Sequence, residues 1–295
     1  MTSVGVIAHA GKRLGGGLPA LRGALARHGV NDARWEEVRK SKQVPDRVRS
    51  LVDEGVDLLF TWGGDGTVQR TIDAVAGDPV TLAILPAGTA NLFATNLGLP
   101  ADIEECVRIG LHGERRTLDV GVMNGEHFAV MGGIGLDAMM IRDAGAGLKD
   151  KVGRIAYLWT GAKNVALKAV KTTIEVDGQP WFEGKASCVL VGNMGEVLGG
   201  LSVFPEASPD DGRLDIGVVT ADGAWEWART LGRSVVGDVS SSPFVQSTTG
   251  TCFVVGLKKR LPYELDGGDR KETKKLKVAV KPGAITVSVP EEGSS

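Results

Sequence analysis

Cysteine is scarce in this chain: three cysteines occur among 295 residues, at positions 106, 188 and 252. The odd count and the wide spacing argue against a framework of disulfide bonds. Isolated thiols are typical of proteins in reducing compartments. We therefore expect these cysteines to be reduced and the protein to be cytoplasmic.

Long hydrophobic runs are also absent, since no apolar stretch reaches the roughly 18 residues of a membrane-spanning helix. The N-terminal "MTSVGVIAHAGKR" has no basic residue before its short apolar stretch, so we interpret it as a strand rather than a signal peptide. These features predict a soluble protein that could still rest on the inner face of a membrane.

An excess of positive charge is missing too, because the formal net charge is −2. A nucleic-acid-binding protein usually presents a basic face, so we expect no nucleic acid as a main partner. Glycine, in contrast, is abundant, with 42 residues or about twice the typical usage. The glycines are not periodic, which indicates many tight turns and close backbone contacts. The sequence is compatible with a homodimer.

The first third of the chain alternates between strand and helix patterns. Apolar segments typical of strands lie at 3–10, 33–38, 56–62 and 80–86. Segments with helical spacing lie at 18–29, 45–55, 68–77 and 89–98. Continuous apolar strands that alternate with helices predict an α/β domain with a parallel sheet.

The texture changes after about residue 115, where the chain becomes β-rich. Asn124-Gly125 joins two strand patterns, a strong hairpin signal. Later segments with turn residues between them predict an antiparallel domain. We divide the chain into domains 1–117 and 118–290, and expect 291–295 to be a disordered tail.

The stretch "GGDGT" lies between a buried strand and a helix. Gly63, Gly64 and Gly66 leave the backbone N–H groups open, so these groups can converge on an anion, and the helix dipole adds to the attraction. Asp65 would repel a phosphate, so we expect it to hold Mg²⁺ beside one. Thr67 could cap the helix or bind a phosphate oxygen. A glycine turn with an Asp cap is the plain alternative.

A second loop of the same kind favours the phosphate interpretation. "LPAGTANLFA" also leaves an apolar strand through proline and glycine, with Gly88, Thr89 and Asn91 at the start of the next helix pattern. Ligands bind at the carboxyl ends of parallel strands, where both loops fall. No G-x-x-x-x-G-K-[ST] motif occurs, and "GIGLDA" at 133–138 lies outside a βαβ unit, so we interpret it as a turn.

Four motifs in order resemble the diacylglycerol kinase catalytic-domain family, which includes bacterial lipid kinases and sphingosine kinases. They are GGDGT at 63–67, PAGTANLFA at 86–94, GGIGLDA at 132–138 and SPDDGRLDIGVV at 208–219. GGDGT alone is shared with NAD kinases, whereas the ordered set is specific. The resemblance runs from about residue 4 to 289.

The resemblance implies a nucleotide-binding α/β domain, a C-terminal β-sandwich-like domain and an active site in the interdomain cleft. It implies transfer of the γ-phosphoryl group of ATP to a lipid hydroxyl with Mg²⁺. The nucleotide-binding positions would be Gly63, Gly64, Asp65, Gly66, Thr67, Gly88, Thr89 and Asn91.

A structural Mg²⁺ site of bacterial members maps to the Asp211 carboxylate with the Ser208 and Arg213 carbonyls. An ordinary acidic turn before a strand is the plain alternative.

The chain departs from the family pattern where the proposed general base, a glutamate, should stand. "YELDGGDR" places Gly268 at that position, and glycine cannot accept a proton. Asp266 or Asp269 could replace the missing carboxylate, so we count both with Asp65 as catalytic candidates. A solvated turn residue is the equal alternative for Asp269. Smaller departures are Ala8-His9 and Gln69-Arg70.

Two stretches raise the question of lipid access. Residues 149–171 have the pattern of a basic amphipathic helix, and Trp225 and Trp227 lie close together. Either could rest on an anionic membrane, but packing against the protein is favoured for both.

Three functions follow from these residues. The first is an ATP- and Mg²⁺-dependent kinase of diacylglycerol or a related lipid alcohol. The second is a soluble-substrate kinase of the NAD kinase kind. The third, suggested by Gly268, is a catalytically weak module that binds nucleotide or lipid.

Overall fold

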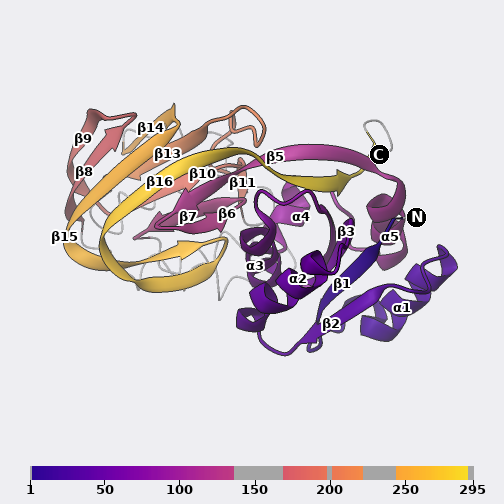
Figure 1. Cartoon of the computed structure of the whole chain (residues 1–295). Coiled ribbons are helices and arrows are strands. Elements are labelled where there is room, and N and C mark those ends of the chain that lie inside the picture. Colours follow the sequence, from indigo (N-terminus) through magenta and orange to yellow (C-terminus); the bar gives the residue numbers. More distant parts are fainter. Residues whose placement is uncertain (1, 136–168, 198–200, 222–243, 292–295) are drawn as a thin grey trace. The chain divides into compact units, whose positions relative to one another are not determined.

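The computed structural model describes residues 2–135, 169–197, 201–221 and 244–291. The chain divides into two compact units (Figure 1). Unit 1 holds residues 1–120 and 282–295, and unit 2 holds residues 121–281. The chain passes from one unit to the other within strand β5 (Glu114–Met123) and again within strand β16 (Gly268–Val289).

Unit 1 contains a parallel sheet with the order β2-β1-β3-β4-β16. The strands are β1 (Val4–His9), β2 (Arg34–Val38), β3 (Leu58–Gly63), β4 (Thr81–Pro86) and the end of β16. The helices are α1 (Gly17–Arg27), α2 (Val44–Asp53), α3 (Asp65–Val75), α4 (Leu92–Asn96) and α5 (Ile103–His112), and the short 3-10 turns are Leu14–Gly16 and Ser41–Gln43.

Hydrophobic spacing decides where these helices pack. Helices α1 and α5 bury Leu21, Leu25 and Val107 against Phe60 and Leu85 of the sheet. Helices α2 and α3 pack against each other, and α2 also contacts β1. Every residue of β3 is buried, as expected for a strand covered on both faces. The predicted parallel α/β domain is confirmed.

Unit 2 is antiparallel. Its main sheet has the order β14-β13-β10-β7-β15-β16, and β8 joins β15 while β9 joins β8. The strands are β6 (Glu126–Phe128), β7 (Met131–Ile134), β8 (Val170–Val176), β9 (Gln179–Ala186), β10 (Cys188–Gly192), β13 (Leu214–Val219), β14 (Val245–Gly250) and β15 (Cys252–Leu265). A separate two-stranded sheet pairs β11 (Glu196–Val197) with β12 (Leu201–Ser202).

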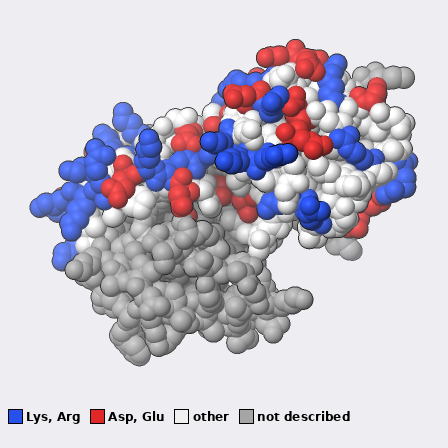
Figure 2. All heavy atoms as spheres, turned by 90° about the horizontal axis from the view of Figure 1, so that it is seen from below, with Lys and Arg blue, Asp and Glu red and all other residues white. Residues whose placement is uncertain are grey.

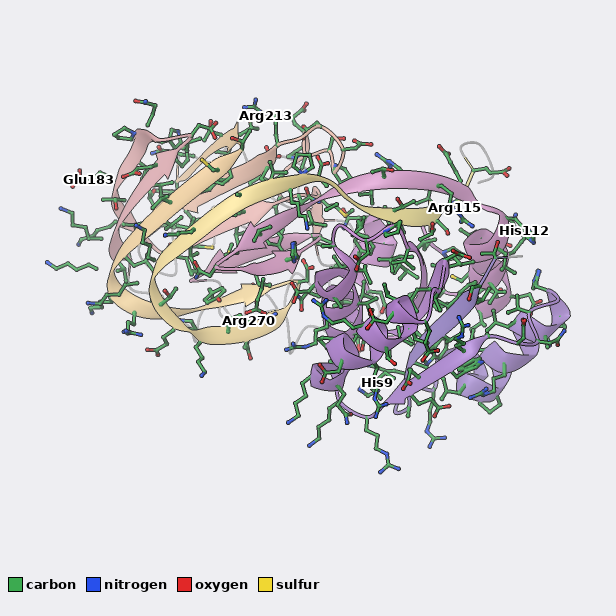
Figure 3. All side chains as sticks on the ribbon, viewed as in Figure 1. His9, His112, Arg115, Glu183, Arg213 and Arg270 are labelled. Carbon is green, nitrogen blue, oxygen red and sulfur yellow. The ribbon has the colours of Figure 1, made fainter. Side chains whose placement is uncertain are left out.

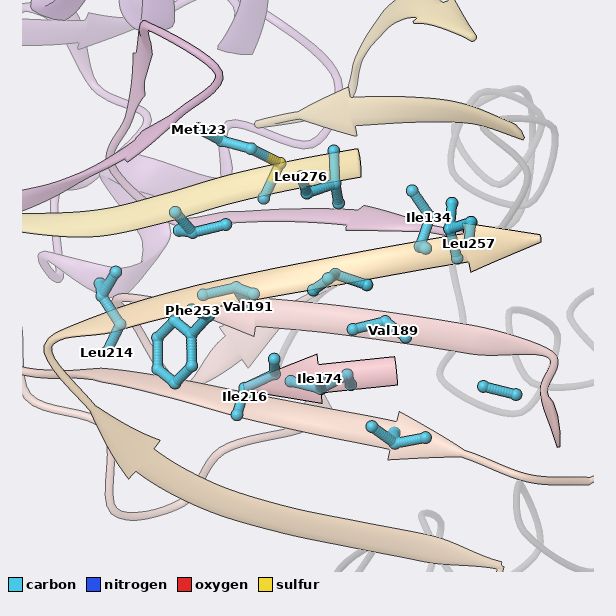
Figure 4. Close-up of a cluster of buried hydrophobic side chains, with 14 of the residues drawn as sticks. Met123, Ile134, Ile174, Val189, Val191, Leu214, Ile216, Phe253, Leu257 and Leu276 are labelled. Atoms are coloured by element: carbon cyan, nitrogen blue, oxygen red, sulfur yellow. The ribbon is translucent and has the colours of Figure 1, made fainter. Parts of the chain in front are cut away.

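The core of unit 2 comes from alternate residues of its strands, which share one face (Figure 4). Ile174, Val191, Ile216 and Phe253 are each at most 1% exposed. The hairpin predicted at Asn124-Gly125 is confirmed, because Met123 pairs with Glu126 across a two-residue turn. Both turn residues have positive φ, 51° and 92°, as this turn requires.

The structure differs from the sequence prediction in several elements. Helix α4 covers only Leu92–Asn96 within the predicted 89–98, because Asn91 takes the left-handed conformation and starts the helix late. Helix α5 was missed. Only parts of the long strands β15 and β16 were predicted as strands. The predicted helix at 149–171 cannot include Val170 and Lys171, because these residues begin β8.

The sequence division at 117/118 did not anticipate that residues 282–295 return to unit 1. Most of the 149–171 pattern, Trp225 and Trp227, and the end of the "GIGLDA" motif lie outside the described residues. In the described part of the chain, none of the helices has the length and apolar character needed to cross a membrane.

Candidate functional site

The first loop of the candidate site joins β3 to α3. Gly64 is the N-cap of α3 and has an extended backbone, and its carbonyl accepts hydrogen bonds from the N–H groups of Thr67 (2.8 Å) and Val68 (3.1 Å). A Cβ atom at Gly63 would lie 2.4 Å from the Cβ of Thr67. Only glycine therefore fits at Gly63, because Thr67 is buried directly against it.

The second loop joins β4 to α4 and is closed by Asn91. The Asn91 side chain accepts a hydrogen bond from the Gly88 N–H (2.7 Å) and donates one to the Gly88 carbonyl (3.0 Å). Asn91 itself has a positive φ of 51°, a conformation that asparagine tolerates well. Thr89 lies between them with an exposed side chain.

The structure brings these two loops together. The Asp65 carboxylate accepts hydrogen bonds from the N–H groups of Asn91 (3.0 Å) and Leu92 (2.5 Å). It therefore caps helix α4 from the neighbouring loop. Gly64 and Gly88 touch: a Cβ atom at Gly88 would lie 2.6 Å from the Gly64 Cα. The two loops therefore form one surface, packed backbone to backbone at these glycines.

The charge balance at this surface is set by burial and by one lysine. Burial raises the pKa of Asp65, while the N–H groups of Leu92 and Asn91 and the positive charge of Lys12 pull that pKa down. The Lys12 Nζ lies 3.6 Å from the position that a Cβ at Gly64 would take. Sequence reasoning missed Lys12; its place just after the first strand in "HAGKR" was the available signal.

The predicted metal segment, residues 208–213, forms a tight turn before β13 in unit 2. The Ser208 hydroxyl donates to the Asp210 carboxylate (2.7 Å), and the Arg213 N–H donates to the Asp211 carboxylate (2.8 Å). Burial, and secondly the negative charge of Asp211, raises the pKa of the following Asp215 to about 6. Within the described residues, no cluster of three or more Asp, Glu, His or Cys side chains could hold a metal ion.

The predicted base segment is the hairpin turn between β15 and β16. Asp266 and Gly267 both have positive φ, 44° and 74°, in a two-residue turn closed by the pair Leu265–Gly268. The buried Asp266 carboxylate accepts three hydrogen bonds, from the N–H groups of Ala129 (2.8 Å), Val130 (2.9 Å) and Met131 (2.9 Å). These bonds fix the hairpin to the start of β7.

The guanidinium group of Arg270 takes the space beside Gly268, because a Cβ atom at Gly268 would lie 2.9 Å from the Arg270 Nη1. Figure 3 labels Arg270 among the side chains of unit 2. Arg270 also donates to the Glu126 carboxylate through Nε (2.7 Å) and to the Gly268 carbonyl through Nη1 (3.0 Å). Asp269 is exposed. The structure thus gives Asp266 a structural role and leaves the Asp269 carboxylate open to solvent.

The chemistry of the two-loop surface in unit 1 fits a polyphosphate. Backbone N–H groups at a helix N-terminus, with glycines that carry no side chain of their own and a lysine beside them, are the elements of a phosphate site. The 208–213 and 266–269 segments belong to unit 2.

Comparison with known proteins supports this interpretation. Residues 6–123 match the profile of the "Diacylglycerol kinase catalytic domain". Residues 131–289 match that of the "YegS C-terminal NAD kinase beta sandwich-like domain". The "probable lipid kinase YegS-like" protein of Pseudomonas fluorescens is 30% identical over 268 residues, which is 88% of each chain.

The diacylglycerol kinase of Bacillus subtilis is 28% identical over 215 residues, covering 72% of this chain and 71% of the relative. A Bacillus anthracis crystal structure assigned as a diacylglycerol kinase has a TM-score of 0.81 at 26% identity, covering 97% of this chain and 96% of its own. An Archaeoglobus fulgidus NAD kinase shares only the fold, with a TM-score of 0.53 at 12% identity over 98% of this chain and 93% of its own.

The sequence had already indicated this family, and the β-sandwich-like second domain agrees with the antiparallel strands of unit 2. The chain belongs to the diacylglycerol kinase catalytic-domain family and is a phosphotransferase with an alcohol group as acceptor.

Proposed function

We propose that this protein is an ATP- and Mg²⁺-dependent lipid kinase that phosphorylates the hydroxyl group of diacylglycerol or a related lipid alcohol. The names of its relatives support the lipid substrate. The observation that carries the nucleotide assignment is the contact between Gly64 and Gly88, tied by Asp65.

The nucleotide phosphates bind over the two loops. The N–H groups of Gly64 and Gly66 lie at the N-terminus of α3, where the helix dipole is positive, whereas the Thr67 N–H is already bonded to the Gly64 carbonyl and only shapes this turn. The backbone at Gly63 shapes the turn beneath. Gly88, Thr89 and Asn91 contribute from the second loop, and the Lys12 ammonium neutralises phosphate charge.

Magnesium has two proposed positions. At the nucleotide, the Asp65 carboxylate would hold the hydrated ion beside the phosphates. In unit 2 the Asp211 carboxylate and the Ser208 and Arg213 carbonyls would hold a structural ion, which fits the acidic residues gathered in this turn, Asp210, Asp211 and Asp215. When bound, Mg²⁺ neutralises the charge that develops on the phosphate oxygens during transfer.

The general base of this kinase cannot be the glutamate of the family pattern, because Gly268 stands at that position. Asp266 already accepts three N–H hydrogen bonds, so we assign it to positioning the hairpin, and Asp269 is the better candidate for proton acceptance. A base typically contributes about 10²–10⁴-fold to such a reaction. Its weakening would slow the kinase and leave ATP binding intact.

Transfer of labelled phosphate from ATP to diacylglycerol in mixed micelles tests the function. We expect transfer that requires Mg²⁺, and a loss of at least roughly 100-fold in Asp65→Ala, because charge-assisted positioning is lost. Asp46→Ala, which removes an exposed carboxylate from the first turn of α2, is the control for loss of a negative charge. No transfer to any lipid, with wild type equal to Asp65→Ala, would refute the proposal.

Gly268, in place of the expected glutamate, supports a second candidate function: a catalytically weak protein that mainly binds nucleotide or lipid. Calorimetry that shows tight ATP binding while turnover stays undetectable would favour it. An NAD kinase-like activity has less support, because the NAD kinase likeness extends only to the fold. Formation of phosphorylated NAD would revive that alternative.

A further inference from the structure

The hairpin of β15 and β16 carries a concentration of positive charge. Residues 258–281 contain nine Lys or Arg and four Asp or Glu, in a chain whose net charge is −2. Two of those four acids, Glu264 and Asp266, are buried. The exposed bases are Lys258, Lys259, Arg260, Lys271, Lys274, Lys275 and Lys277.

A large bulge places three of these bases side by side. Gly256 pairs with Lys275, but the next pair is Leu261 with Thr273. Between these two pairs β15 advances by five positions, whereas β16 advances by only two. The extra residues include Lys258, Lys259 and Arg260. Bulges redirect side chains away from the regular pleat, and here they turn consecutive bases toward solvent.

The neighbouring strands extend the same surface. Leu257 pairs with Thr172 of β8, so Lys171 follows in register beside the bulge. Lys171 in turn pairs with Lys185 of β9, and both side chains are exposed. Figure 2 shows Lys and Arg gathered at the left end of unit 2, where Figure 1 places the bend of β15. We name Lys171, Lys185, Lys258, Lys259, Arg260, Lys274 and Lys275 the basic edge.

Among the residues that the structure describes, the basic edge is neutralised only in part. Glu183 forms an ion pair with Lys171 at 3.1 Å. Within the described part of the chain, no salt bridge is formed by Lys258, Lys259 or Arg260, and Arg260 donates only to the Glu272 carbonyl (3.4 Å). Like charges held this close repel one another, so the arrangement weakens the fold slightly unless an anion offsets it.

We propose that the basic edge is a docking surface for a bilayer rich in anionic phospholipid. The proposal rests on the proposed function, because a lipid kinase must reach a hydroxyl group that lies at a bilayer. A row of flexible lysines matches a planar array of phosphate groups. Each Lys or Arg near an anionic surface contributes roughly fivefold in affinity, so three contribute about 100-fold.

Co-sedimentation with vesicles tests the surface directly. The variant Lys258→Gln/Lys259→Gln/Arg260→Gln should bind phosphatidylglycerol-containing vesicles about 100-fold more weakly than wild type. The control Arg22→Gln/Arg34→Gln/Arg49→Gln removes the same charge from exposed sites of unit 1 and should bind like wild type. Vesicles of phosphatidylcholine alone should bind none of the three proteins, and added salt should weaken the wild type.

A kinase assay separates docking from catalysis. Phosphorylation of a water-soluble short-chain diacylglycerol should be the same in wild type and the triple variant, whereas phosphorylation of long-chain diacylglycerol in anionic vesicles should fall. If neither protein phosphorylates diacylglycerol, the proposed function fails while the vesicle result still judges the docking surface. Equal vesicle binding by the triple variant and wild type, or tighter wild-type binding to duplex DNA than to vesicles, overturns the docking proposal.

Discussion

Asp65 joins two loops that are 26 residues apart in sequence. Its carboxylate accepts the first N–H groups of α4, while its own backbone belongs to the first turn of α3. The side chain that we propose as a magnesium ligand therefore also holds the second glycine loop in place. The two roles are compatible, because each carboxylate oxygen has a second lone pair for a hydrated ion.

The glycines of the two loops differ in what they tolerate. We expect Gly88→Ala to lower the free energy of unfolding by about 2–3 kcal/mol, because the new methyl group meets the Gly64 backbone. Gly66→Ala should keep or raise it by about 0.5–1 kcal/mol, since its Cβ meets nothing closer than Ser41 Oγ at 3.8 Å. Urea unfolding measures both.

ATP binding distinguishes packing from ligand contact at the same positions. If the phosphates lie over the loop, Gly66→Ala should weaken ATP binding about tenfold although the protein stays folded, because its exposed methyl group stands in the anion's path. Full ATP affinity in a stable Gly66→Ala protein would argue against the proposed phosphate position.

The three thiols should differ sharply in reactivity. Burial raises the pKa of Cys106 to about 12, so at pH 8 only about one thiol in 10⁴ is ionised, and the thiolate is the reactive form. Cys188 is buried as well, whereas Cys252 is exposed. Titration of the folded protein with a thiol reagent should give one fast-reacting group, which Cys252→Ser removes. A second fast-reacting thiol in the folded Cys252→Ser protein would contradict this.

At the scale of elements, the turn between β15 and β16 shows how one carboxylate fixes a hairpin. Asp266→Ala should lower the free energy of unfolding by about 3 kcal/mol, since three buried N–H groups lose their acceptor. The exposed Asp269→Ala should change it by less than about 0.5 kcal/mol. Denaturant unfolding compares the two.

The kinase assay completes that comparison, because we expect Asp266→Ala to lower mainly stability and Asp269→Ala to lower mainly activity. Loss of activity in Asp269→Ala without loss of stability would mark Asp269 as the proton acceptor. Activity lost only in Asp266→Ala, with unfolding unchanged, would instead restore Asp266 as the catalytic candidate.

At the scale of the whole molecule, unit 1 is not complete until strand β16 returns to it. Thr286 and Val287 of β16 lie parallel to Thr81 and Leu82 of β4, and the Gly283 N–H donates to the buried Asp119 carboxylate (2.8 Å). The returning strand buries Ala284, Ile285, Val287 and Val289. A segment of 14 residues, 282–295, therefore belongs to a unit that begins at the other terminus.

Truncation after Lys281 should accordingly unfold unit 1. Burial of these side chains is worth on the order of 6 kcal/mol, comparable with the whole stability of a typical domain. Circular dichroism should show lost helix, and ATP binding should disappear. Removal of residues 291–295 alone, the predicted disordered tail, is the control and should leave both unchanged. A truncated protein that still binds ATP would show that the returning strand is dispensable.

Local patterns were enough to predict much of unit 1. The apolar runs predicted β3 and β4, and the glycine positions predicted where each strand ends. Helix α5 was not predicted, although the sequence contains its N-cap signal. The Asp102 side chain accepts a hydrogen bond from the Glu105 N–H (2.9 Å), and an acidic N-cap residue three positions before a glutamate is typical of a helix start. The alternation of polar and apolar residues in "KLKVAV" likewise indicates the middle of β16. The lysines between the apolar residues made the buried face of this strand hard to recognise.

By itself, then, the sequence determined the parallel α/β arrangement, the two glycine loops and the family, because each depends on residues close together in the chain. Only the tertiary structure decided that Asp65 ties the second loop, that Lys12 stands beside Gly64 and that Arg270 fills the space at Gly268. It also decided that the last strand returns to the first unit. These are contacts between distant segments, and hydrophobic periodicity and turn chemistry carry no information about which segments will meet.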